Sequence, residues 1–145
     1  MNAPTPRVLA IVLAALVFAP STGSAERAFK SAAKDNFKWH CAQCHGEKGN
    51  GKGPNATADL PVEPRDLTSK TDIPRFTDDQ VTKTLTHGGP ANELSSIMPP
   101  WGNTLSKKEI EDLLAFVRTL GGPFNPDLGP PEKTKRKTDA ALSDR

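Results

Sequence analysis

The five residues Cys41-Ala42-Gln43-Cys44-His45 constrain this chain more than any other feature, because they contain both of its cysteines. Two thiols so close together cannot join distant segments, so no long-range disulfide is available within the chain. The same spacing allows both thiols to bond to the two vinyl groups of one haem, and the histidine that follows can bind the iron. The motif therefore predicts one haem c, attached covalently through Cys41 and Cys44, with His45 as an axial ligand.

Two other uses of a close cysteine pair compete with this interpretation. A thioredoxin-like dithiol expects the pair inside a strand–helix–strand unit, and half of a zinc site needs a second pair of ligands. Neither context is present, because the motif leads into a long stretch rich in glycine and proline. Haem attachment therefore remains the preferred interpretation.

The first 25 residues have the three-part layout of a secretory signal peptide. Arg7 precedes an apolar run over residues 8–18, and Gly23 and Ala25 stand at the small-residue positions before a cleavage point. The apolar run is shorter than the roughly 20 helical residues that cross a hydrocarbon core. We therefore expect residues 1–25 to be removed on export, which leaves a periplasmic protein without stable membrane insertion; the competing interpretation is an uncleaved anchor.

Charge gives no sign of a nucleic-acid partner. Of the 19 basic side chains, removal of Arg7 leaves 18, against 17 acidic ones. No basic stripe alternates with aromatic residues, and the densest basic run covers residues 133–137 near the C-terminus. Proline, glycine and charge dominate from residue 122 onward, so residues 122–145 are predicted to be a Pro-rich, charged and disordered tail.

Helical signals flank the cysteine motif on both sides. Apolar residues recur at helical spacing ahead of it, which predicts an amphipathic first helix that runs into the motif; they are Ala28, Phe29, Ala32, Ala33 and Phe37. Further along the chain, Thr77 and Gln80 form a capping box before a short helix that ends at Gly88-Gly89.

The clearest helix begins after Ser106, which forms a second capping box with Glu109. One apolar stripe follows and ends at Gly121; it consists of Ile110, Leu113, Leu114, Val117 and Leu120. Residues 46–76 show little helix or strand signal. The chain is therefore predicted to be all-α, with three or four helices and long loops wrapped around the haem.

A second axial ligand is expected from Met98, the only methionine left after removal of the signal peptide. It lies in a proline-stiffened loop, which can present a thioether free of helical constraint. The alternative is that Met98 is an ordinary core residue. Two other imidazoles compete for the iron: His40 is adjacent to Cys41, and His87 lies at a predicted helix end.

Together these motifs resemble the class I c-type cytochromes, over roughly residues 26–121. Phe37 and Ala33 are similar to the aromatic and small residues of that family's first helix. The segment Asp112 to Arg118 is similar to its last helix, so the resemblance implies that Ala33, Phe37, Leu113 and Phe116 meet at a helix crossing.

The resemblance also implies further roles for residues around the haem. Gly53-Pro54-Asn55 is similar to a segment in which the proline carbonyl accepts the ring N–H of the axial histidine, so Pro54 is expected to orient His45. Arg65, Trp39 and Trp101 are candidate partners of the haem propionates or of the ring edge.

The predicted ligand pair leads to a functional expectation. A histidine and a methionine fill both axial positions, so the iron changes only its oxidation state. We expect a monomeric, non-enzymatic one-electron carrier of the respiratory chain with separate donor and acceptor proteins. The alternatives are a haem c subunit held permanently by a periplasmic dehydrogenase or reductase, a small haem enzyme such as a peroxidase, and a gas sensor.

Overall fold

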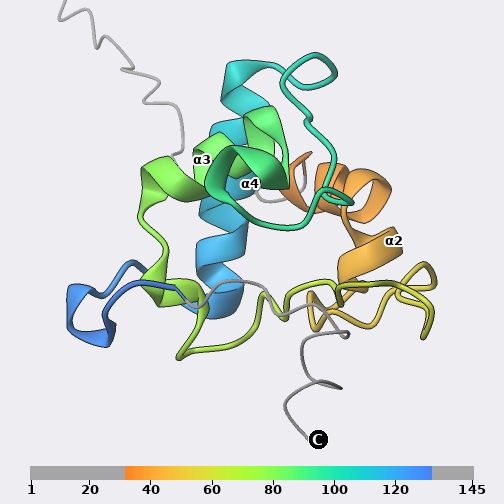
Figure 1. The fold of residues 1–145 in the computed structure, drawn as a ribbon. Coiled ribbons are helices and arrows are strands. Elements are labelled where there is room, and N and C mark those ends of the chain that lie inside the picture. The colour runs from red at the N-terminus through yellow and green to blue at the C-terminus, as the bar shows by residue number, and fades with distance from the viewer. Residues whose placement is uncertain (1–31, 132–145) are drawn as a thin grey trace, which may run out of the picture.

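A computed structural model describes residues 32–131 as a set of helices joined by long loops, with no strand among them (Figure 1). Residues 32–40 are helical and lead directly into the short helix α2 (Ala42–His45). The two longer helices are α3 (Asp78–His87) and α4 (Lys107–Gly121). Three 3-10 turns complete the set: η1 (Ile73–Arg75), η2 (Gly89–Asn92) and η3 (Pro126–Leu128). The predicted all-α class is confirmed.

Both predicted capping boxes are present at the helix starts. The hydroxyl of Thr77 accepts from the Gln80 amide at 3.1 Å, and the Gln80 side chain accepts from the Thr77 amide at 2.9 Å. The hydroxyl of Ser106 likewise accepts from the Glu109 amide at 3.3 Å, and Glu109 accepts from the Ser106 amide at 2.9 Å. Each box satisfies amides that the first helical turn leaves without partners, which is why α3 and α4 begin where the sequence predicts.

The first helix crosses α4 where the family resemblance implied. The rings of Phe37 and Phe116 lie 5.0 Å apart at an angle of 50°. Ala33 is 1% exposed and Leu113 is fully buried. The side-chain amide of Asn36 also donates to Glu109 at 3.3 Å, so a polar contact joins the two helices beside the apolar one.

The C-terminal end of α4 packs closely on the η1 region. A methyl group on Gly121 would lie 2.5 Å from the Ile73 Cβ atom, so this approach requires glycine. Arg118 donates to the Phe76 carbonyl at 2.6 Å and forms an ion pair with Asp78 at 2.7 Å. These contacts fix η1 and the start of α3 against α4.

The packed chain continues beyond residue 121, where the predicted domain ends. In Figure 1 the last described segment, drawn in blue, runs beside η1. The Asn125 amide donates to the Pro74 carbonyl at 2.7 Å, and Arg75 donates to the Leu128 carbonyl. Residues 122–131 are therefore folded onto the domain, which corrects the prediction of disorder for this part of the tail.

Two predictions fall outside the described residues: the signal peptide over residues 1–25 and the disorder of residues 132–145. Within residues 32–131, no helix has the length and apolar character needed to span a bilayer.

Candidate functional site

One cavity of about 980 Å³ brings the predicted site residues together. Cys41 lines it from just before α2, Cys44 and His45 line it from α2, and Met98 lines it from the loop between η2 and α4. Apolar side chains from the loop over residues 60–76 and from α3 and α4 form much of the remaining wall, among them Leu60, Val62, Phe76, Leu85, Leu113 and Val117. A large apolar cavity with a few convergent donor groups is typical of a cofactor site.

The two cysteine thiols face this cavity unpaired. Burial, and secondarily the neighbouring Cys44, raises the pKa of the Cys41 thiol to about 12. Thiol–disulfide exchange needs a thiolate, so a thiol held in its protonated form is poorly suited to a redox-active dithiol. No group of three or more His, Cys, Asp or Glu side chains within residues 32–131 is placed to hold a metal ion. The geometry of the described residues therefore favours neither competing use of the cysteine pair.

His45, the last residue of α2, is held in one tautomer. Its Nδ1 atom lies 2.9 Å from the Arg65 carbonyl oxygen, which can only accept, so Nδ1 carries the proton and Nε2 keeps its lone pair. Burial lowers the pKa of His45; the hydrogen bond to Arg65 opposes this effect, and the Arg65 charge adds to it. The imidazole is therefore neutral at neutral pH, as a metal ligand requires.

The expectation that Pro54 orients His45 is wrong in this structure. Pro54 is exposed and its neighbours bind the backbone of α2 instead: Gly53 donates to the Cys44 carbonyl at 3.0 Å and Asn55 donates to the Gln43 carbonyl at 2.8 Å. The segment thus satisfies carbonyls at the end of the short helix. The Nδ1 partner of His45 in this structure is the Arg65 carbonyl instead.

Gly51 explains how the Arg65 segment comes so close to His45. The Gly51 amide donates to the His45 carbonyl at 2.8 Å. The Gly51 Cα atom lies against the backbone of Pro64 and Asp66, where a Cβ atom would point. Its φ angle of 75° and the overlap of any Cβ atom with the Pro64 carbonyl oxygen both require glycine. The sequence predicts only a loop at Gly51 and carries no signal for the close backbone packing that this glycine allows.

The Met98 loop is fixed to the end of α3. The Gly89 amide donates to the Met98 carbonyl at 3.0 Å, and the Met98 amide donates to the Ser95 carbonyl at 3.2 Å. A Cβ atom on Gly89 would overlap the Ser95 carbonyl and lie 3.1 Å from the Met98 Cβ atom. Gly88-Gly89, predicted only as a helix end, therefore also allows the loop to pack tightly.

The other candidate residues fall into two groups. Arg65, Trp39, Trp101 and His40 all line the cavity, with the His40 ring 4.8 Å from that of Trp101 and Trp39 largely exposed. His87 is exposed and is not among the lining residues. Its competition with Met98 for the iron therefore has no support in the geometry.

These residues fit a haem c. Two unpaired thiols, a neutral imidazole with a free Nε2 and a thioether share one apolar cavity. Thioether attachment and histidine–methionine ligation require this set of groups. Polar side chains from the η1 region, including Arg65 and Arg75, complete the lining.

Comparison with known proteins agrees with this assignment. Residues 28–117 match the family described as cytochrome C oxidase, cbb3-type, subunit III. Among curated protein sequences, none gives a significant match.

One solved structure shares the fold, and a second was also compared. A chain of the Kuenenia stuttgartiensis reducing HAO-like protein complex Kustc0457/Kustc0458 is similar with a TM-score of 0.51 and 23% identity, covering 72% of this chain and 47% of its own. This protein thus spans about half the length of that chain. The KustC0563 c-type cytochrome matches with a TM-score of 0.48 and 22% identity over 61% of this chain and 96% of its own. Since its sequence matches the family over most of the described region, this chain belongs to the cbb3-type oxidase subunit III family and is a class I c-type cytochrome, an electron-transfer protein with covalently bound haem c.

Proposed function

We propose that this protein is a periplasmic one-electron carrier of a respiratory chain with a single haem c. Cys41 and Cys44 form the two thioether bonds, and His45 and Met98 are the axial ligands. The observation that carries this proposal is the meeting of all four side chains in one cavity. When bound, the haem supplies an iron that alternates between the ferric and ferrous states.

The protein's own residues determine what this site can do. His45 presents Nε2 because its Nδ1 proton is held by Arg65. With Met98 on the remaining axial position, no position stays open for oxygen or peroxide, which favours electron transfer over catalysis or gas sensing. The apolar wall excludes water and disfavours the extra charge of ferric iron, so we expect a positive reduction potential.

The first experiment tests attachment and ligation on the exported protein. A pyridine haemochrome assay should find one covalent haem per chain, and the Cys41→Ala/Cys44→Ala variant should have none. The oxidised protein should show the weak long-wavelength absorption band of iron–sulfur ligation, which should vanish in Met98→Ala and persist in His87→Ala. Loss of the band in His87→Ala alone would refute Met98 as the ligand.

A permanent place in a larger enzyme is the second candidate. The family description names an oxidase subunit, and the first of the similar structures is a chain of a protein complex. A free carrier forms small and transient interfaces, whereas a subunit remains bound through purification. Size-exclusion chromatography of the native protein distinguishes the two: a monomer supports the carrier, and a stable larger assembly supports the subunit.

A further inference from the structure

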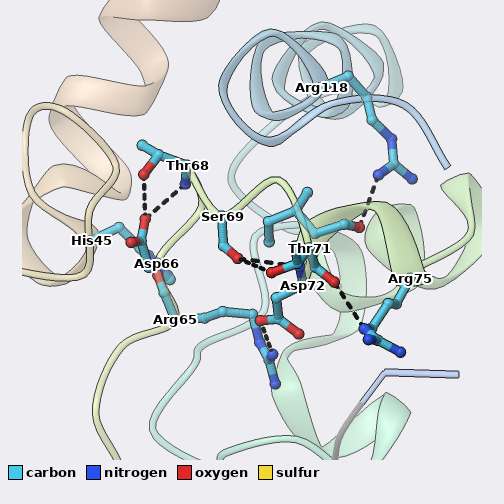
Figure 2. Close-up of polar contacts among 10 residues, drawn as sticks. His45, Arg65, Asp66, Thr68, Ser69, Thr71, Asp72, Arg75 and Arg118 are labelled. Carbon is cyan, nitrogen blue, oxygen red and sulfur yellow. Dashed lines mark hydrogen bonds and ion pairs between the residues drawn. The ribbon is translucent and has the colours of Figure 1, made fainter. Parts of the chain in front are cut away.

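Arg65 links His45 to the start of η1. Its carbonyl oxygen accepts the Nδ1 proton of His45 at 2.9 Å, whereas its guanidinium donates to the carboxylate of Asp72 (Figure 2). The same guanidinium lies over the ring of the buried Phe76, with its carbon atom 4.8 Å from the ring centroid. Thus the backbone of Arg65 binds the proposed iron ligand, while its side chain is held by Asp72 and Phe76.

We propose that Asp72 is a positioning residue for His45: by holding the guanidinium of Arg65, it keeps the Arg65 carbonyl against the imidazole N–H. This inference rests on the proposed role of His45 as an axial ligand. Asp72 itself touches no reacting atom and acts only through Arg65.

The Asp72 carboxylate is well placed to act as an anchor. The side chains of Arg65 and Asp72 are only 21% and 29% exposed, so their attraction is less screened than that of a surface pair. The Asp72 backbone is also fixed, because its amide donates to the Ser69 hydroxyl at 3.1 Å and its carbonyl accepts from the Arg75 amide at 3.1 Å. In Figure 2, dashed lines join Asp72 to Arg65 and to Ser69.

Hydrogen bonds of neighbouring residues also restrain this loop. The Leu67 amide donates to the Gly49 carbonyl at 2.7 Å, and the Asp66 carboxylate accepts from the Thr68 amide at 2.8 Å. Both hold residues that follow Arg65. The ion pair with Asp72 and the contact with Phe76 both hold the guanidinium, so loss of Asp72 should weaken this hold and loosen the bond between the Arg65 carbonyl and His45.

The direct measurement is hydrogen exchange of the His45 Nδ1 proton, followed by NMR in the reduced holoprotein. In Asp72→Asn we expect exchange about fivefold faster than in the wild type, the factor expected when one hydrogen bond loses its typical net contribution. Asp78→Asn is the matched control, because it also removes one negative charge and one ion pair with an arginine, here Arg118. An unchanged exchange rate in Asp72→Asn, or an equal acceleration in Asp78→Asn, would overturn the proposal.

Arg65→Met separates positioning from a simple charge effect. If Arg65 and Asp72 acted only through charge, removing each would shift the reduction potential in opposite directions and leave the exchange rate unchanged. Positioning predicts faster exchange in both variants, and no further acceleration in the double variant. If Asp72→Asn fails to assemble, Arg65→Met carries the test alone: faster exchange supports positioning and an unchanged rate refutes it.

The role of Asp72 and the proposed function can be refuted separately. A wild-type protein without covalent haem, or without the band of iron–sulfur ligation, would refute the proposed function. A wild-type protein with both, whose variants exchange the His45 proton at the wild-type rate, would refute only the role of Asp72.

Discussion

Gly89 and Met98 are joined by a hydrogen bond of 3.0 Å from the glycine amide to the methionine carbonyl, and their Cβ positions would lie only 3.1 Å apart. This contact connects the end of α3 to the loop that presents the proposed second axial ligand. The Met98 thioether therefore depends on the absence of a side chain at position 89.

Gly89→Ala should weaken or break methionine ligation. The added methyl group would overlap the Ser95 carbonyl and force the loop away from α3. We expect the iron–sulfur band to diminish, the reduction potential to fall and the ferrous protein to bind carbon monoxide at neutral pH. Gly129→Ala is a control for backbone strain alone: it adds a methyl group at a φ angle of 71°, away from the Met98 loop, where the nearest neighbour would be an Arg75 nitrogen 3.9 Å away, so it should keep the band. Full retention of the band in Gly89→Ala would contradict this account.

Gly51→Ala should disturb His45 through the Arg65 segment. The variant combines strain at a φ angle of 75° with overlap of the Pro64 carbonyl, so we expect a loss of about 1–3 kcal/mol in unfolding free energy. Because the hydrogen bond to Arg65 raises the basicity of the His45 imidazole, its weakening should also raise the reduction potential.

Pro54→Gly provides the comparison, because the family resemblance predicts the His45 contact at Pro54 and the structure shows it at Arg65. Protein-film voltammetry of both variants should show the larger shift in potential for Gly51→Ala. A larger shift for Pro54→Gly would restore the role of Pro54.

The contrast between Pro54 and Arg65 shows what the sequence could and could not predict. Capping boxes at Thr77 and Ser106 are local signals, since each is complete within four residues, and both helices begin as predicted. The partner of His45 depends on how a long irregular loop folds back 20 residues later, which has no periodic pattern to reveal it.

The same distinction applies to the C-terminal segment. Its proline and glycine content predicts disorder, yet the Asn125 amide finds a partner in the Pro74 carbonyl. Composition describes the average tendency of a segment, whereas this contact depends on the particular surface that η1 presents.

The Phe37–Phe116 contact should contribute measurably to stability. We expect a double-mutant cycle with Phe37→Leu and Phe116→Leu to give a coupling energy of about 1 kcal/mol, as is typical of tilted aromatic pairs. The measurement is guanidinium unfolding of the holoprotein, followed by circular dichroism. A coupling energy of zero would mean that the two rings contribute only through separate burial.

Glu109 should make the start of α4 sensitive to acid. Hydrogen bonds from the Ser106 amide and hydroxyl, with a further one from Asn36, lower the pKa of Glu109 below its ordinary value of 4.5. A carboxyl group with a lowered folded-state pKa stabilises the protein above its unfolded pKa, and this contribution disappears as the pH falls through the folded-state value.

Glu109→Gln keeps the capping box but removes the titrating group. Its unfolding free energy should therefore depend less on pH below about 4.5 than that of the wild type. Thermal unfolding across this range measures the difference, with Glu111→Gln on the same helix as control. Equal acid sensitivity in wild type and Glu109→Gln would show that the capping interaction does not couple folding to pH here.

Removal of the haem should unfold much of the domain. A cavity of about 980 Å³ lies at the meeting point of the helices, and in the holoprotein the haem replaces the water or empty space that would otherwise fill it. A ligand bound only by the native state stabilises that state, so the Cys41→Ala/Cys44→Ala chain should lose most of its helical circular dichroism. The two substitutions alone remove little side-chain volume, which makes the haem the main difference between the two proteins. Native-like helicity and cooperative unfolding of the haem-free chain would show that α3 and α4 form a stable core without the cofactor.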